Sequence, residues 1–207
     1  MNYPKYLMER IRSLTNRGKT QIANEGLYFT LLATIVVVNI SLFCYGVWYQ
    51  IHAPVIGISN YLLPVGRGCG LTLEFNCALI LLPMCHSILT LLRKYPFFVL
   101  VIPFEHLRAL HIFLANLIGI GSLVHSILQI ANYITASNLD APHVIFTSGI
   151  SGGISLFITG FILLFILAII IAAAVKPIRK RVKFEVFFYS HHLFVVFYLA
   201  LLLHGQR

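Results

Sequence analysis

The chain has 207 residues, of which 59% are hydrophobic and only 10% are charged, and its mean hydropathy is +0.89. Soluble domains carry roughly 25% charged residues, so this composition excludes an ordinary water-soluble enzyme and predicts one compact domain in a lipid bilayer. The formal net charge is +9, but thirteen of the fifteen Lys and Arg residues lie in four short stretches, which indicates membrane topology and not a nucleic-acid partner.

Residues 1–26 form the only long hydrophilic stretch, and we expect this basic segment to lie in the cytosol. Two interpretations of it are open. Apolar side chains at helical spacing between Tyr3 and Leu14 would suit an amphipathic helix on the membrane surface, but a disordered basic leader would suit the same sequence. Residues 27–205 are expected to form the membrane domain.

Five apolar runs follow, at about 27–50, 69–92, 106–133, 150–175 and 184–204, each close to the ~20 residues that span a bilayer. The loops between them at 51–68 and 134–149 contain Gly, Pro, Asn and Asp and nearly lack Lys and Arg, so they are expected on the outer side. We therefore predict an all-α membrane protein, a bundle of about five transmembrane helices in the plasma membrane or an internal membrane, with a cytosolic N-terminus.

Histidines inside the spanning runs indicate chemistry, because an ionisable side chain at that depth needs a partner. In the third run, His111 and His125 are fourteen residues apart, which on a helix gives roughly 21 Å of rise with both side chains on one side. Two haems stacked across a bilayer require such a spacing. Gly119 and Gly121, between them, would either let a porphyrin approach the backbone or serve helix packing.

The fifth run carries His191, His192 and His204. The rise from His191 to His204 suits the second ligand of each haem, but on an ideal helix the two point roughly 140° apart. A local 3₁₀ or π irregularity, or divergent rotamers, would have to absorb this difference, and spacing alone does not choose between His191 and His192. Because neutral imidazole is a standard axial ligand, we predict two stacked b-type haems, with Phe197 either between their edges or serving as apolar filling.

Two stretches of the sequence are similar to signatures of NADPH oxidase catalytic subunits. The first is residues 67–85, RGCGLTLEFNCALILLPMC, and the second is Ile178-Arg-Lys followed by residues 184–205, FEVFFYSHHLFVVFYLALLLHG. The resemblance extends over about residues 25 to 205. It implies a ferric-reductase-like transmembrane domain with two bis-histidine haems, in which electrons cross from the cytosolic to the outer face and reduce molecular oxygen to superoxide.

The resemblance also assigns the ligands to the two leaflets. It implies an inner haem on His111 and His191 and an outer haem on His125 and His204. It selects His191 over His192, which spacing could not do. Electrons would enter at the inner haem, pass to the outer haem and leave one at a time.

Further site residues take their roles from the same resemblance. Arg67 matches an arginine beside the outer haem, where its charge would suit a propionate or nascent superoxide, although anchoring a lipid headgroup is the other interpretation. Phe197 matches an aromatic residue between the haems. Gln129 stands where the family usually has a second histidine, and an amide cannot release a proton as imidazolium does. Apart from the resemblance, Glu74 is expected near the outer end of the second spanning helix, where it would pair with Arg67 or tune this site.

The family's sixth helix and its FAD- and NADPH-binding domain have no counterpart in these residues. FAD and NADPH are therefore expected on a separate domain or on a cytosolic flavin dehydrogenase partner. The other expected partners are membrane lipid and a small membrane subunit. Two alternatives to the oxygen-reducing function are open: a reductase of ferric or other metal ions and, in a different class, a proton-conducting or structural helical bundle.

Overall fold

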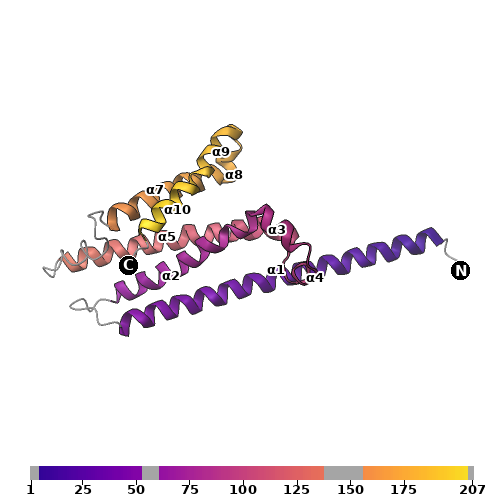
Figure 1. Cartoon of the computed structure of the whole chain (residues 1–207), viewed down its shortest axis with the longest axis horizontal. Coiled ribbons are helices and arrows are strands. Elements are labelled where there is room, and N and C mark those ends of the chain that lie inside the picture. The colour runs from indigo at the N-terminus through magenta and orange to yellow at the C-terminus, as the bar shows by residue number, and fades with distance from the viewer. Residues whose placement is uncertain (1–4, 53–60, 138–155, 205–207) are drawn as a thin grey trace. The chain divides into compact units, whose positions relative to one another are not determined.

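The computed structural model describes residues 5–52, 61–137 and 156–204, and every regular element within these ranges is a helix (Figure 1). The long elements are α1 (Lys5–His52), α2 (Leu62–Ile80), α5 (Leu107–Ser137), α7 (Leu156–Ala174) and the consecutive pair α9 (Phe184–His192) and α10 (Phe194–His204). Short helices connect them: η1 (Leu82–Met84), α3 (His86–Leu92), α4 (Pro96–Val101), η2 (Phe104–His106) and α8 (Lys176–Arg179). The predicted all-α architecture is confirmed.

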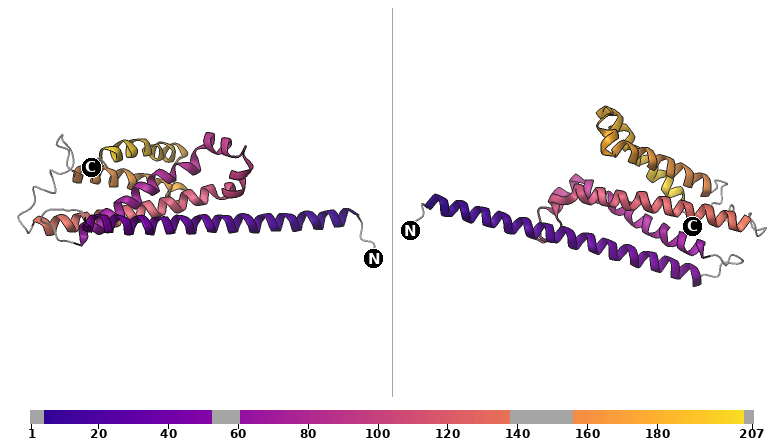
Figure 2. Two further views of the ribbon diagram at one scale, coloured as in Figure 1. Left: turned by 60° about the horizontal axis from the view of Figure 1, so that its bottom comes forward. Right: turned by 180° about the vertical axis from the view of Figure 1, so that it is seen from behind.

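Helix α1 runs without a break from Lys5 to His52, as Figures 1 and 2 both show. Residues 5–26 therefore continue helically into the first membrane span, and the backbone has no interruption where the two predicted segments meet at 26/27. The assignment of residues 1–26 to the cytosol stays a prediction.

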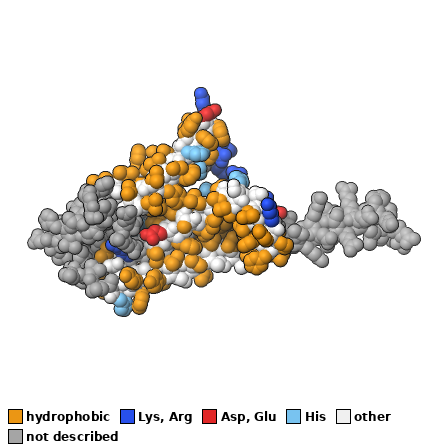
Figure 3. All heavy atoms as spheres, in the orientation of Figure 1, with side chains coloured by type: hydrophobic (Ala, Val, Ile, Leu, Met, Phe, Trp, Pro, Cys, Tyr) orange, Lys and Arg blue, Asp and Glu red, His pale blue; other side chains and the backbone are white. Residues whose placement is uncertain are grey.

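Four stretches of described helix are long and apolar enough to cross a membrane: Glu25–His52, Leu62–Met84, Phe104–Asn132 and Phe184–His204. A shorter apolar stretch, Ile158–Ala174, corresponds to the predicted run 150–175, whose first residues lie outside the described ranges. Large apolar side chains are exposed along these helices, and hydrophobic atoms dominate the described part of the face in Figure 3. Such exposure is typical of helices that cross a membrane, and the chain is a multi-pass membrane protein.

The chain divides into two compact units, which are described separately below. Unit 1 comprises Met1–Ser41 and Phe75–Leu114, and unit 2 comprises Leu42–Glu74 and Ala115–Arg207. Helices α1, α2 and α5 each contribute one part to each unit. Among the predicted ligands, His111 belongs to unit 1, and the other three belong to unit 2.

In unit 1, a pair of amides joins α1 to α2. Asn39 Nδ2 donates to Asn76 Oδ1 at 3.2 Å, and Asn76 Nδ2 donates back to Asn39 Oδ1 at 2.6 Å. Asn76 is buried, and a buried amide in a membrane is stable only when its hydrogen bonds are made. The reciprocal bonds therefore fix the register of these two helix segments.

In unit 2, two glycines bring the backbones of α1 and α2 into contact. A Cβ placed on Gly46 would lie 2.9 Å from Gly68 Cα, and a Cβ placed on Gly68 would lie 2.9 Å from the Phe43 carbonyl oxygen. Membrane helices use small residues where their backbones approach this closely. The glycines around Arg67 therefore belong to a helix interface.

The prediction for the second run, residues 69–92, is wrong at both ends. Helix α2 begins at Leu62, so Arg67 lies inside the helix and not in an outer loop at 51–68. Of the glycines that favoured a loop, Gly68 serves the contact with α1, and Gly66 lies against Gln129 of α5. At the other end, α2 stops at Ile80 ahead of Pro83, because proline lacks the N–H that would continue the helical hydrogen bonding.

Replacing Gly68 by alanine is expected to destabilise the protein. The added methyl group would overlap the Phe43 carbonyl oxygen, which belongs to the backbone and cannot rotate away. We therefore expect the free energy of unfolding to fall by about 1–3 kcal/mol. A lower midpoint of thermal unfolding in detergent would reveal it. Gly26→Ala is the matched control, because a Cβ there meets nothing within 4 Å, and equal losses in the two variants would contradict the contact.

The remainder of unit 2 packs around α7. Helices α8, α9 and α10 all contact α7, and α10 runs beside it in Figures 1 and 2. The helix is interrupted at Leu193, between α9 and α10. There the Leu193 N–H donates to the Ser190 carbonyl at 3.3 Å, which is a 3₁₀-type hydrogen bond. The histidine spacing left a local irregularity or divergent rotamers as alternatives in this run, and the structure has a local irregularity.

Candidate functional site

His125 lies on α5 beside Gly66 and Gly70 of α2. Its Nδ1 donates to the Gly66 carbonyl at 2.9 Å, and a Cβ on Gly70 would lie 3.5 Å from Cε1 of the ring. Since a peptide carbonyl can only accept a hydrogen bond, this geometry puts the proton on Nδ1 and leaves the lone pair on Nε2. A neutral imidazole in that tautomer can act as a metal ligand through Nε2.

His204 lies in the last turn of α10, and residues of α7 give its ring surroundings similar to those of His125. Its Nδ1 lies 2.8 Å from the hydroxyl oxygen of Thr159, a buried residue, and a Cβ on Gly160 would lie 3.3 Å from Cε1 of the ring. A hydroxyl can accept from Nδ1–H or donate to Nδ1, and in the first arrangement the lone pair of His204 is again on Nε2. His204 also lies within electrostatic range of His125, so the structure brings the two predicted outer ligands into one neighbourhood.

Two more predicted site residues lie in this neighbourhood. Arg67 follows Gly66 on α2, is half-buried with a buried Nε, and interacts electrostatically with both His125 and His204. Gln129 lies one turn after His125, and a Cβ on Gly66 would be 3.1 Å from its Nε2. Gly66 is thus the point where these side chains converge. Glu74 interacts electrostatically with His125, and its pairing with Arg67 stays a prediction.

His111, in unit 1, forms a hydrogen bond with the C-terminal end of α2. Its Nδ1 donates at 3.2 Å to the carbonyl of Ile80, the last residue of α2, where helix carbonyls lack a partner in the next turn. The same tautomer follows, with the proton on Nδ1 and the lone pair on Nε2. Gly66 and Ile80 are fourteen residues apart on α2, the spacing of His125 and His111 on α5, so α2 provides one main-chain acceptor for each histidine.

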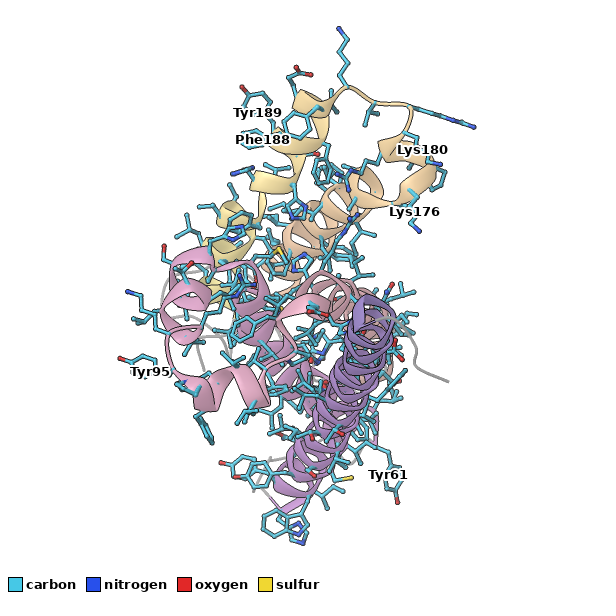
Figure 4. All side chains as sticks on the ribbon, turned by 90° about the vertical axis from the view of Figure 1, so that its right-hand side faces the viewer. Tyr61, Tyr95, Lys176, Lys180, Phe188 and Tyr189 are labelled. Carbon is cyan, nitrogen blue, oxygen red and sulfur yellow. The ribbon has the colours of Figure 1, made fainter. Side chains whose placement is uncertain are left out.

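The adjacent histidines of α9 have different surroundings. His191 stacks on the Phe187 ring with centroids 5.3 Å apart, and its Nδ1 is buried. His192 is exposed, and its Nδ1 donates to the Phe188 carbonyl of its own helix at 2.7 Å; the Phe188 side chain projects away from the helices in Figure 4. The pairing of His191 with His111, which belongs to the other unit, stays a prediction.

Phe197 and the glycines of α5 complete the predicted set. Phe197 is buried and meets the Tyr198 ring edge-on, with centroids 5.7 Å apart. A Cβ on Gly119 would lie 3.1 Å from Ile171 Cδ1, and a Cβ on Gly121 would lie 3.1 Å from Leu73 Cδ2. These contacts support the packing interpretation of the two glycines. The location of Phe197 between two haems stays a prediction.

Sequence reasoning missed the residues that hold the outer histidine rings: Gly66, Gly70, Thr159 and Gly160. One signal was available, since a Thr-Gly pair is unusual inside the otherwise strongly apolar helix α7. The hydrogen bond between Thr159 and His204 could not be predicted from the sequence, because 45 residues separate the two.

Comparison with known proteins adds a family to this geometry. Residues 76–202 match the family described as ferric reductase like transmembrane component. The chain is 30% identical to a superoxide-generating NADPH oxidase heavy chain of Dictyostelium discoideum, over 88% of this chain and 37% of that protein. It is 28% identical to respiratory burst oxidase homolog protein B of Arabidopsis thaliana, over 73% of this chain and 21% of that protein, and 26% identical to protein A of Solanum tuberosum, over 96% and 24%.

The chain thus spans between 21% and 37% of the length of these three relatives. The matched residues lie within the part of the chain that crosses the membrane, and they include three of the four predicted ligands. Because the family match covers more than half of the sequence, the chain belongs to the ferric reductase like transmembrane component family.

Proposed function

We propose that the chain carries electrons across a membrane through two b-type haems, from the cytosolic to the outer face, and passes them singly to molecular oxygen. Family membership supports transmembrane electron transfer in an oxidoreductase family whose redox cofactors are haem and flavin. A relative that generates superoxide supports oxygen as the acceptor. The observation that carries the proposal is the hydrogen bonding of the two outer histidines: the Gly66 carbonyl leaves Nε2 of His125 available, and the Thr159 hydroxyl can accept from Nδ1 of His204 and leave its Nε2 available as well.

The residues present fit haem as the cofactor. Haem, when bound, supplies reversible one-electron reduction. His125 and His204 are suited to hold the outer haem, because each ring is oriented through Nδ1 and has a glycine against Cε1. His111 is suited to the inner haem by its bond to Ile80, and the buried Nδ1 of His191 favours this residue over exposed His192 as the second ligand.

Arg67 and Gln129 would serve the acceptor. The positive charge of Arg67 would attract a propionate or the superoxide anion as charge develops on oxygen. Gln129 can donate an amide hydrogen bond but not a proton. The reaction O2 + e⁻ → O2•⁻ takes up no proton, so an amide where the family usually has histidine is compatible with superoxide formation.

Electrons would reach the inner haem from NADPH through FAD, on a cytosolic dehydrogenase domain or partner protein. The relative from Dictyostelium is named as a heavy chain, which supports an assembly with a second, smaller membrane protein. Lipid surrounds the exposed apolar helices.

A reduced-minus-oxidised absorption spectrum of the purified chain, with a haem assay, tests the proposal. We expect two low-spin b-type haems per chain. A well-folded but colourless protein would overturn the proposal and leave a proton-conducting or structural bundle. Assaying superoxide and ferric reduction in the same membranes decides between oxygen and metal ions as the acceptor.

A further inference from the structure

The two outer histidines are held at the same two ring positions but by different chemical groups. His125 has a main-chain carbonyl at Nδ1, whereas His204 has the side-chain hydroxyl of Thr159. From this difference we infer that Thr159 is a positioning residue, which acts through His204 on the reduction potential and the retention of the outer haem. The inference rests on the proposed function.

Thr159 and Gly160 together form the contact surface for the ring of His204, which is called the His204 contact below. Thr159 is only 5% exposed, and its hydroxyl oxygen lies 2.8 Å from Nδ1. The next residue, Gly160, leaves space for the neighbouring ring atom: a Cβ there would lie 3.3 Å from Cε1, tighter than ordinary van der Waals contact. Two consecutive residues of α7 therefore fix both the distance and the rotation of the imidazole.

His125 has contacts at the same two ring atoms as the His204 contact, Nδ1 and Cε1. Gly66 accepts from Nδ1 of His125, and Gly70, one helical turn later, leaves room at Cε1. Each outer histidine thus has a hydrogen-bonding oxygen at Nδ1 and a glycine at Cε1, on two separate helices. When Nε2 of His204 binds the iron, Nδ1 carries the proton, so the Thr159 hydroxyl would be its acceptor. An acceptor at this position selects the tautomer of a ligating histidine and raises the basicity of its other nitrogen.

The role of Thr159 in the redox chemistry follows from that basicity. A more basic Nε2 stabilises the ferric state relative to the ferrous state, which lowers the reduction potential. Valine has nearly the shape of threonine but no acceptor, so Thr159→Val would leave a partly buried N–H on His204 without its partner. The ligand would become less basic and less firmly oriented, and the outer haem would become easier to reduce and easier to lose.

The test compares three purified variants with the wild-type chain. Thr159→Val is expected to shift one of the two haem midpoints in the positive direction and to release one haem to excess apomyoglobin roughly 10- to 100-fold faster. Thr159→Ser, which keeps the hydroxyl, is expected to restore both values. Thr34→Val is the matched control, because the Thr34 side chain is exposed on α1 and its hydroxyl bonds the Thr30 carbonyl of its own helix.

Two outcomes overturn the inference and leave the proposed function standing: unchanged midpoints and haem release in Thr159→Val, or an equal change in Thr34→Val. A wild-type chain without haem would instead refute the proposed function. Gly160→Ala gives a second route that does not depend on the folding of the valine variant. Its methyl group would displace the His204 ring and is expected to shift the same midpoint, and the absence of a shift would contradict the inference.

Discussion

Alanine in place of His204 is expected to remove one of the two haems, and alanine in place of His125 is expected to remove the same one. Each imidazole would supply one of two axial bonds, so losing either leaves a single protein ligand in an enlarged cavity. The haem content should fall from two to one per chain in each variant. Because the two residues act on one haem, the double variant His125→Ala/His204→Ala should also keep one haem, and a pyridine haemochrome assay would measure it.

The neighbouring histidines provide the control. His192 is exposed and bonded to its own helix, so His192→Ala is expected to keep both haems, whereas His191→Ala is expected to lose the inner one. If His192→Ala lost a haem and His191→Ala kept both, the ligand assignment would be wrong. A double variant at positions 125 and 204 that lost both haems would contradict their pairing.

Glutamine in place of Arg67 is expected to slow the delivery of electrons to oxygen. Glutamine keeps hydrogen-bonding capacity but removes the positive charge that interacts with His125 and His204. Removal of one preorganised electrostatic group from a reacting site typically lowers the rate on the order of 100-fold. Stopped-flow reoxidation of the dithionite-reduced chain by oxygen measures this rate and needs no flavin domain.

The absorption spectrum separates the possible roles of Arg67. An unchanged spectrum with slow reoxidation supports a role at the acceptor, while loss of haem would assign the arginine to holding the cofactor. Unchanged reoxidation would support the headgroup-anchoring interpretation. Arg181→Gln is the control, because Arg181 is an exposed cation of the basic connection before α9 and is expected to leave the rate unaltered.

Much of the fold could be predicted from the sequence, because apolar runs of bilayer length leave the backbone little choice but helix. The start of α2 could not. Glycine usually marks a turn, and residues 66–70 contain three of them, but here Gly68 permits contact with Phe43 of α1. Local composition does not reveal that a partner helix lies close enough to make glycine favourable.

The candidate site divides in the same way. The spacing of His111 and His125 follows from helix geometry, and the phase mismatch between His191 and His204 indicated an irregularity. Its position at Leu193 was hidden, because no glycine or proline marks it. The hydrogen-bond partners were hidden for another reason: they are main-chain carbonyls or lie on a helix distant in sequence.

The carbonyl of Gly66 has a consequence for how this site tolerates mutation and redesign. An acceptor that belongs to the peptide bond survives every substitution that preserves helix α2, so no exchange of a side chain deletes the partner of His125. The partner of His204 disappears with a single codon change. Variation in the redox behaviour of such chains is therefore expected to accumulate on α7, and an engineer would adjust the outer site from that helix.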